Sequence, residues 1–253
     1  MQNTSESARE RHVLILIAME AEAAPLLAKL AIPEITFGDC FCPCKGYSGV
    51  YKGQRISVVT NGKCALSSDG NGVDNVGTTP AAIATYVAIT QLKPTLVINA
   101  GTAGGFKSKG AVIGDTFVST ILRHHDRRIT IPGWDDYARG HHKAHPCDQL
   151  IQSLGFKTGV VTTGNSLDAT DTCRKEMLTN DASVKDMEGA AIAWVAEYAN
   201  IPFIAIKCVT DIVDGDQPTH EEFMANLSTA AASLQVSLIN TVEYLIGKEN
   251  SNL

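Results

Sequence analysis

Short runs of consecutive apolar residues recur along this chain, and such runs are typical of strands that are buried on both faces of a parallel sheet. Two clear examples are Val13–Ala18 and Leu96–Ala100. Less uniform runs predict further strands at Tyr47–Tyr51, Ile56–Thr60, Gly114–Ser119, Gly159–Thr163, Val184–Met187 and Phe203–Val209. Lys52-Gly53-Gln54 has the composition of a hairpin turn, so the first two of these shorter strands are expected to pair.

Longer segments between these runs have the spacing of helices. Four are predicted, at Glu20–Leu30, Thr78–Leu92, Glu188–Ala199 and Glu221–Ile246. Because strands alternate with helices, we expect an α/β fold, a three-layer αβα sandwich around a central mixed, largely parallel sheet. No linker or internal repeat divides the chain, so residues 12–253 are predicted to form one domain. The polar residues 1–11 are predicted to be a disordered leader.

The remaining segments are predicted to be loops. Asn61–Gly77 is rich in Gly, Asn, Asp and Ser, and Gly101–Gly105 has the composition of a tight turn directly after a strand. Arg123–Pro146 is long, polar and aromatic without a clear period, and a loop of this length inside a domain is usually functional or disordered. Asp211–Thr219 is predicted to be an acidic loop.

Composition narrows the class of protein. Hydrophobic residues make up 44% of the 253 residues, which is ordinary for a globular protein with a substantial core. The net charge of −6 argues against a partner that presents many phosphates, so no nucleic acid is expected. No apolar stretch is long enough to span a membrane, and Met1–Arg11 lacks the apolar segment of a secretory signal. We therefore expect a cytoplasmic protein that does not bind a membrane.

The chain has seven cysteines, of which Cys40, Cys42 and Cys44 lie close together. Without a secretory signal, disulfides are not expected. The one-residue spacing of these three cysteines differs from the usual zinc pattern, and no histidine is adjacent. The sequence therefore favours an irregular loop with free thiols, and no metal site is predicted.

Polar side chains gather after four of the predicted buried strands. Glu20 and Glu22 follow the first strand, Gly101–Gly105 the middle one, and Thr210-Asp211 the last, while Asp186-Met-Glu188 lies at a strand-to-helix junction. Ligands of such sheets bind beyond the carboxyl ends of the strands. Carboxylates from several converging strand ends therefore predict acid–base chemistry on a small neutral or cationic substrate.

Each of these features also has an ordinary structural explanation. Glu20, Glu22 and Glu188 open helices, where the helix dipole favours carboxylates. Asp211 has the character of a turn or capping residue, and Gly101–Gly105 could be only a tight turn. The prediction of an acid–base site rests on the combination, because all four features are expected at one edge of the sheet.

Together these segments resemble a known family. Ile17–Glu22, Ile98–Gly105, Asp186–Glu188 and Thr210-Asp211 look like the signatures of the 5′-methylthioadenosine/S-adenosylhomocysteine nucleosidases, which belong to the nucleoside phosphorylase superfamily. The resemblance to the plant-type branch rests on further stretches: His125–Arg128, Thr163-Gly164, Ser166–Asp168 and Asp211–Gly215. The likeness runs from about Val13 to the C-terminus. It implies a nucleoside phosphorylase-like fold, a small nucleoside substrate and no cofactor.

The resemblance also implies roles for individual residues. Asp211 matches the general acid that protonates purine N7, and Glu22 matches the base that activates a water on the opposite face of the sugar. The matching substrate-binding residues are Thr102, Ser166, Leu167, Asp168, Met187, Glu188 and Lys207. Glu188 is expected on the ribose hydroxyls, Met187 against the sugar and Leu167 against the purine. The segment 166–168 is expected to read the adenine edge through its main chain.

The family resemblance further implies a homodimer in which a neighbour's loop closes the 5′ end of the site. Several large apolar residues on Arg123–Pro146 fit such a contact: Ile129, Ile131, Trp134 and Tyr137. A tightly closed site would favour methylthioadenosine, because the homocysteine of adenosylhomocysteine adds two charges that need partners. Methylthioadenosine is therefore the expected substrate, in methionine salvage, and acceptance of adenosylhomocysteine stays open.

Two other functions fit parts of the pattern. A purine-nucleoside phosphorylase would need arginines to hold phosphate, but Gly101–Gly105 carries none and Glu22 would repel the anion. A non-catalytic storage-type relative would be secreted or vacuolar and would tolerate loss of the acids. This chain lacks the apolar segment of a secretory signal and has Glu22, Glu188 and Asp211, so hydrolysis is the preferred prediction. Three features stay unassigned: the Cys40–Cys44 run, Lys63, and Asn165 at a position where plant-type relatives have Asp.

Overall fold

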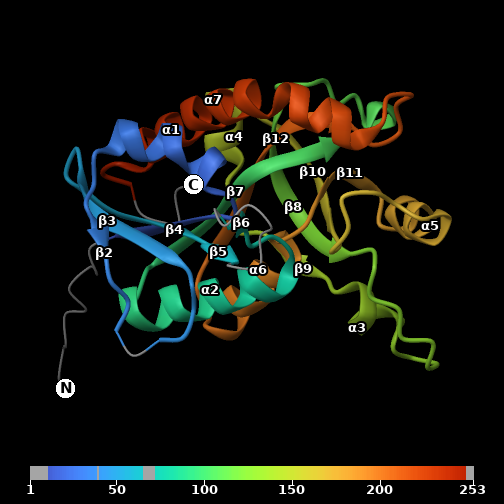
Figure 1. Cartoon of the computed structure of the whole chain (residues 1–253), viewed down its shortest axis with the longest axis horizontal. Coiled ribbons are helices and arrows are strands. Elements are labelled where there is room, and N and C mark those ends of the chain that lie inside the picture. Colours follow the sequence, from blue (N-terminus) through green and yellow to red (C-terminus); the bar gives the residue numbers. More distant parts are fainter. Residues whose placement is uncertain (1–10, 39, 65–71, 249–253) are drawn as a thin grey trace, which may run out of the picture.

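The computed structural model describes residues 11–38, 40–64 and 72–248 (Figure 1). Its main feature is a ten-stranded sheet in the order β11-β10-β8-β12-β7-β1-β4-β3-β2, with β9 paired to β8 off this path. The strands are β1 (His12–Ile17), β2 (Glu34–Ile35), β3 (Lys45–Tyr51), β4 (Gln54–Thr60), β7 (Leu96–Gly105), β8 (Thr116–His124), β9 (His142–Lys143), β10 (Lys157–Thr163), β11 (Ala182–Asp186) and β12 (Phe203–Ile212).

The sheet is mixed, as predicted. β4, β1, β7 and β12 pair in parallel, and so do β8, β10 and β11, while an antiparallel pairing of β12 with β8 joins the two groups. β3 and β4 form the predicted hairpin. A small separate sheet, β5 (Lys63–Cys64) with β6 (Val73–Asp74), lies within the segment that was predicted to be a loop.

Helices cover both faces of the sheet, which gives the predicted three layers (Figure 1). One face carries α1 (Glu20–Leu30), α4 (Asp148–Leu154) and α7 (Thr219–Leu245); the other carries α2 (Thr78–Leu92) and α6 (Gly189–Tyr198). β1 explains why both faces must be covered. Its residues Val13, Ile15 and Ile17 pack into the first core, and Leu14 and Leu16 into the second. All five are buried, each worth about 1.5–3 kcal/mol relative to exposure.

The ends of the long helices agree closely with the sequence pattern, but three short helices were not predicted. These are α4, α5 (Asp171–Thr179) and α3 (Asp135–Arg139), and a 3₁₀ turn spans Lys107–Lys109. The predicted loop Arg123–Pro146 therefore contains the end of β8, α3 and β9. Every helix in the described part of the chain is too short or too polar to span a membrane.

The largest error of the sequence prediction concerns Gly101–Gly105, which is not a turn. These residues continue β7, and all five pair with β12 in parallel. At the far end of β7, Gly104 and Gly105 also pair antiparallel with Lys185 and Val184 of β11. β7, β12, β8, β10 and β11 consequently close into a ring, which brings the ends of β11 and β12 together.

The predicted leader lies mostly outside the described residues, which begin at Arg11. Arg11 itself is anchored, because its Nη1 donates to the carbonyl of Leu245 at 2.7 Å. The predicted acidic loop begins later than Asp211, since β12 runs on to Ile212.

Candidate active site

A cavity of about 210 Å³ opens where β1, β7, β11 and β12 end. Most of its wall is apolar, and four carboxylates lie on it. The lining residues are Ala18, Met19, Glu22, Val76, Thr102, Ala103, Gly104, Leu167, Lys185, Asp186, Met187, Glu188, Thr210, Asp211 and Phe223. The predicted convergence of polar strand ends is therefore correct.

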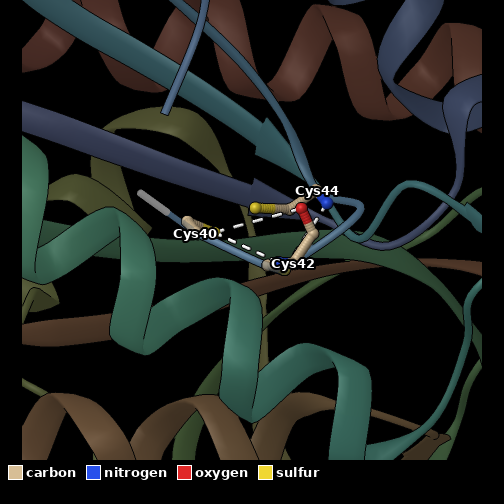
Figure 2. Close-up of side chains that lie close together, drawn as sticks. All are labelled: Cys40, Cys42 and Cys44. Atoms are coloured by element: carbon tan, nitrogen blue, oxygen red, sulfur yellow. Dashed lines mark hydrogen bonds between the residues drawn. The ribbon is translucent and has the colours of Figure 1, made fainter. Parts of the chain in front are cut away.

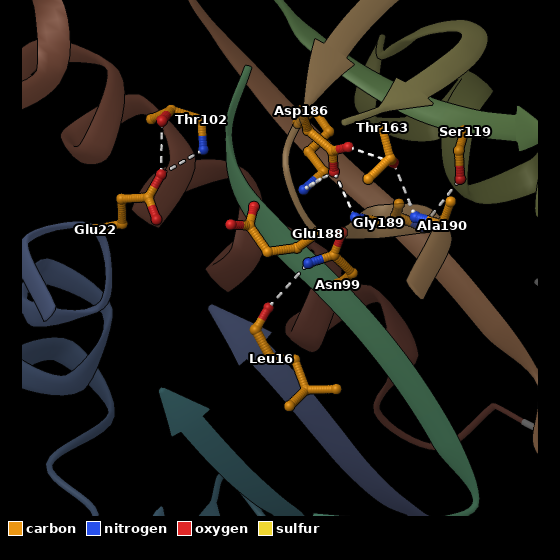
Figure 3. Close-up of polar contacts among 12 residues, drawn as sticks. Leu16, Glu22, Asn99, Thr102, Ser119, Thr163, Asp186, Glu188, Gly189 and Ala190 are labelled. Atoms are coloured by element: carbon orange, nitrogen blue, oxygen red, sulfur yellow. Dashed lines mark hydrogen bonds and ion pairs between the residues drawn. The ribbon is translucent and has the colours of Figure 1, made fainter. Parts of the chain in front are cut away.

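Glu22 lies in the first turn of α1 and is only 4% exposed. Its Oε1 accepts two hydrogen bonds from Thr102, one from the backbone N–H and one from the hydroxyl, each 2.6 Å long (Figure 3). Burial raises the pKa of Glu22, although the hydrogen bonds from Thr102 and the charge of Lys207 oppose this shift. A carboxylate with a raised pKa is a stronger proton acceptor than an exposed one, provided that it is ionised.

Asp211 is presented by an irregularity in β12. The register against β7 shifts between Val209 and Asp211, as in a β-bulge, which commonly re-aims a side chain beside a site. The Asp211 side chain is 3% exposed and its Oδ1 accepts from the Thr210 hydroxyl at 2.7 Å. A Cβ atom at Gly104 would lie 2.7 Å from Asp211 Oδ2, so only glycine fits there. Burial raises the pKa of Asp211, which suits a proton donor.

Glu188 lies directly before α6, on the wall of the same cavity. Its Oε1 accepts from the backbone N–H of Gly77 at 2.8 Å, which ties the start of α2 to the site. Burial, and then the charge of Asp186, raise the pKa of Glu188 to about 7. Among the described residues only Oε1 has a hydrogen-bond partner, so Oε2 is available to a ligand hydroxyl.

Asp186 is the centre of a buried polar network (Figure 3). Its Oδ2 lies 2.8 Å from Lys207 Nζ, and the two side chains are 0% and 1% exposed. The same oxygen accepts from the Gly189 N–H at 2.8 Å, and Oδ1 accepts from the Thr163 hydroxyl at 2.6 Å. The network joins β10, β11, β12 and the start of α6. It thereby fixes Glu188, which stands between Asp186 and Gly189 in the sequence.

Lys185 holds the loop that the sequence assigned to the adenine edge. Its Nζ donates to the carbonyls of Ser166 and Leu167 at 2.8 and 2.5 Å. Burial lowers the pKa of Lys185, while the charge of Asp211 opposes that shift. The carbonyl oxygens of this loop are thus partly used by the protein itself.

The structure brings six of the nine predicted site residues onto the cavity wall: Glu22, Thr102, Leu167, Met187, Glu188 and Asp211. Three do not line it. Lys207 lies behind Asp186, whereas Ser166 and Asp168 are exposed on the loop that holds Leu167. The carbonyl of Ser166 accepts a hydrogen bond from Lys185, and the charge of Asp168 acts to raise the pKa of Lys185.

Several lining residues were missed from the sequence. Asp186 had a signal, because it belongs to the same triplet as Met187 and Glu188. Lys185 precedes that triplet on β11, but the direction in which its side chain points depends on the strand pairing, which the sequence did not predict. Val76 and Phe223 come from a loop and from α7, where nothing in the sequence marks them as site residues.

Two unassigned residues have other partners. Lys63 pairs with Glu20, its Nζ lying 3.2 Å from Oε2, and it does not line the cavity. Asn165 joins two segments instead of facing the cavity. Its Oδ1 accepts from both the N–H and the hydroxyl of Thr78, and its Nδ2 donates to Asp126 at 3.0 Å. An aspartate could not make the last of these hydrogen bonds.

The loop predicted at Asn61–Gly77 also reaches the site. Its residues 65–71 lie outside the described part of the chain, but Val76 lines the cavity and Gly77 donates to Glu188.

Comparison with known proteins places this arrangement in a family. The sequence model of the "Phosphorylase superfamily" matches residues 12–243. A 5′-methylthioadenosine nucleosidase of Arabidopsis thaliana is 44% identical over 243 residues, which cover 95% of this chain and 90% of that protein. A 5′-methylthioadenosine/S-adenosylhomocysteine nucleosidase of the same plant is 42% identical, with 95% and 94% covered. The apo structure of the Arabidopsis 5′-methylthioadenosine nucleosidase superposes with a TM-score of 0.92 at 43% identity, covering 96% of this chain and 99% of that one.

Proposed function

This chain belongs to the phosphorylase superfamily, and we propose that it is a nucleosidase that hydrolyses the N-glycosidic bond of 5′-methylthioadenosine. The products are adenine and the 5-methylthioribose. The observation that carries the proposal is the placement of Glu22 and Asp211, from α1 and β12, on the wall of one cavity. Relatives that are more than 40% identical over nearly the whole chain carry the names of this activity.

The reaction needs relief of charge at both ends of the breaking bond. Negative charge develops on the purine and is removed when Asp211 protonates N7, which its raised pKa allows. Positive charge develops on the ribose and is stabilised by the nearby carboxylate of Glu188. Glu22 takes a proton from the water that attacks the anomeric carbon from the opposite face. The arrangement follows the logic of inverting glycosidases, in which two carboxyl groups flank the substrate with room for water.

Other residues hold these groups in place. Thr102 fixes Oε1 of Glu22 with two hydrogen bonds. Oε2 accepts only a long hydrogen bond of 3.4 Å from the backbone N–H of Met19, so among the described contacts it is the oxygen better placed to accept a proton from the water. Lys207 lies close enough for its charge to lower the pKa of Glu22, and it thereby favours the ionised base. Met187 packs against the sugar and Leu167 against the purine. Lys185 orients the carbonyls of the loop that meets the adenine edge.

Phosphate is a poorer nucleophile for this site than water. No arginine is among the described residues that line the cavity. Lys185, the lysine on that wall, already donates to two carbonyls. Glu22 would repel an entering anion. The test is adenine release from 5′-methylthioadenosine with and without phosphate: equal rates support hydrolysis, whereas dependence on phosphate would establish phosphorolysis.

We further propose that the enzyme is a cytoplasmic homodimer that acts in methionine salvage. The support for a dimer is an exposed aromatic cluster on α3 and α6. Ring centroids of Trp134, Tyr137 and Trp194 follow one another at 5.6 and 6.0 Å, and Arg127 lies 4.7 Å above the last ring. Trp134 and Tyr137 are 46% and 52% exposed, a large apolar area for a surface that faces only water.

The proposed dimer also affects which groups can enclose the 5′ substituent of the substrate. None of the described residues of Arg123–Pro146 lines the cavity of its own chain. If this loop closes a site, it must therefore close that of the other subunit. Within one chain, the apolar groups available to a methylthio substituent include Val76 and Phe223.

A further inference from the structure

Residues 40–44, which precede β3, bring three thiols together outside the nucleosidase site. The Sγ atoms of Cys40, Cys42 and Cys44 all lie within 4.8 Å of one another (Figure 2). The intervening Phe41 and Pro43 are exposed, so alternate residues turn the cysteines to one side. The sequence spacing had argued against a zinc site, but it did not anticipate this convergence.

Backbone donors already point at two of the three sulfur atoms. The N–H of Cys42 donates to Cys40 Sγ at 3.2 Å, and the N–H of Cys44 donates to Cys42 Sγ at 3.4 Å. Hydrogen bonds of this kind favour a sulfur atom that carries negative charge. They are also the interactions that orient and tune sulfur ligands around a metal.

The segment is held in place from two directions. Gly38 exchanges two hydrogen bonds with the Gln91 side chain of α2, of 3.0 and 2.8 Å. At the other end, the Pro43 carbonyl packs so closely on Gly62 that a Cβ atom there would lie 1.8 Å from it. A loop restrained in this way loses little further conformational entropy when it closes around a ligand.

We propose that Cys40, Cys42 and Cys44 form a three-coordinate site for one Cu(I) ion. Thiolates are soft ligands that select Cu(I) over harder cations. Zn²⁺ prefers four ligands, and among the described residues no histidine or carboxylate joins this cluster. With metal–sulfur bonds of about 2.3 Å, a trigonal site needs sulfur atoms about 4 Å apart. The observed separations therefore require only small movements. The thiol protons pass to solvent as the metal binds.

The site is separate from the proposed nucleosidase chemistry. None of the three cysteines lines the substrate cavity. The cluster packs on the α2 side of the sheet (Figure 2). Adenine release therefore provides an independent measure of correct folding for every cysteine variant.

The test is a Cu(I) titration of the full-length, reduced protein without oxygen, in competition with a chromogenic Cu(I) chelator. We expect one equivalent to be retained, and X-ray absorption should find three sulfur neighbours at about 2.3 Å. C42S should weaken retention at least tenfold, and the triple serine variant should abolish it, with adenine release unchanged. C64S is the matched control, because Cys64 is also partly exposed but lies outside the cluster.

Three results would overturn the assignment. The first is no retained copper in the wild-type protein. The second is equal loss of copper in C64S and C42S. The third is tighter retention of Zn²⁺ than of Cu(I) in a parallel competition.

Discussion

Lys207 and Asp186 form an ion pair of 2.8 Å that is almost completely shielded from water. The pair joins β12 to the end of β11, where Asp186 itself lines the cavity and Lys207 lies behind it. Desolvation makes such a pair a poor source of net stability, but removal of one partner leaves the other buried and unpaired. Its value to this protein therefore lies in fixing the position of the site.

K207M should lower the free energy of unfolding by about 3–5 kcal/mol, because Asp186 would keep a buried, uncompensated charge. It should also raise the pKa of Glu22, since the cation that opposes the shift is lost. The acidic limb of the pH–rate profile should then move to higher pH. Urea denaturation and a pH–rate profile measure the two effects. K52M is the control, because Lys52 forms an exposed pair with Glu243 and its loss should change neither. Unchanged stability of K207M would contradict this account.

D211N should reduce kcat by roughly 10²–10⁴-fold, because an amide cannot supply the proton that neutralises the leaving base. E22Q should lose activity to a similar extent through loss of the base. Adenine release measures both, and circular dichroism checks that the variants fold. Activity of D211N within tenfold of the wild type would refute its role as the general acid.

The contribution of Glu188 to the stability of the protein should fall as pH rises from 4.5 to about 7. Its folded pKa of about 7 exceeds the unfolded value of 4.5, so between these values the folded state binds more protons. The penalty is absent below pH 4.5 and complete above pH 7. E188Q cannot ionise, so its stability relative to that of the wild type should rise over this pH range in urea titrations at several pH values. Parallel wild-type and E188Q profiles would exclude this assignment.

The protein should be a dimer at micromolar concentration, with the exposed aromatic cluster of α3 and α6 in the interface. W134K and Y137K should produce monomers, because a charge at a buried apolar contact must be desolvated. Analytical ultracentrifugation measures the change. V50K is a matched control, since Val50 is also exposed but lies on β3, on the opposite side of the molecule from α3 (Figure 1). A monomeric wild-type protein would disprove the proposed assembly.

Methylthioadenosine should have a clearly higher kcat/KM than adenosylhomocysteine. The methylthio group is small and apolar, and each Å² that it buries contributes roughly 25 cal/mol. The homocysteine group carries an ammonium and a carboxylate, which need water or partners if the site is closed. A competition assay with both nucleosides, monitored by product analysis, gives the ratio directly. Equal or better efficiency on adenosylhomocysteine would overturn the prediction.

The sequence predicted those parts of the fold that depend on local pattern. α1 and α2 match the predicted bounds, because each has a continuous apolar face and a clear end. The buried strands were also found, although β8 and β12 run further than predicted. Short helices such as α4 were missed because seven residues carry too little periodicity.

Long-range pairing explains the other differences. Gly101–Gly105 looks like a turn in isolation, and only its partners β12 and β11 make it a strand. The same limit applies to the site. Glu22 and Asp211 were found because they follow buried strands, whereas the orientation of Lys185 and the burial of Lys207 depend on neighbours that are remote in the sequence.

The antiparallel contact between β7 and β11 has a consequence for how activity arises during folding. Gly104 and Lys185 are 81 residues apart, with β8 and β10 between them in the sequence, so the contact is strongly non-local. Contacts of this kind form slowly, because the entropy of closing a long loop must be overcome first. Catalytic competence should therefore be gained late in refolding, and a nascent chain that ends before β12 would lack Asp211 and hence a working enzyme.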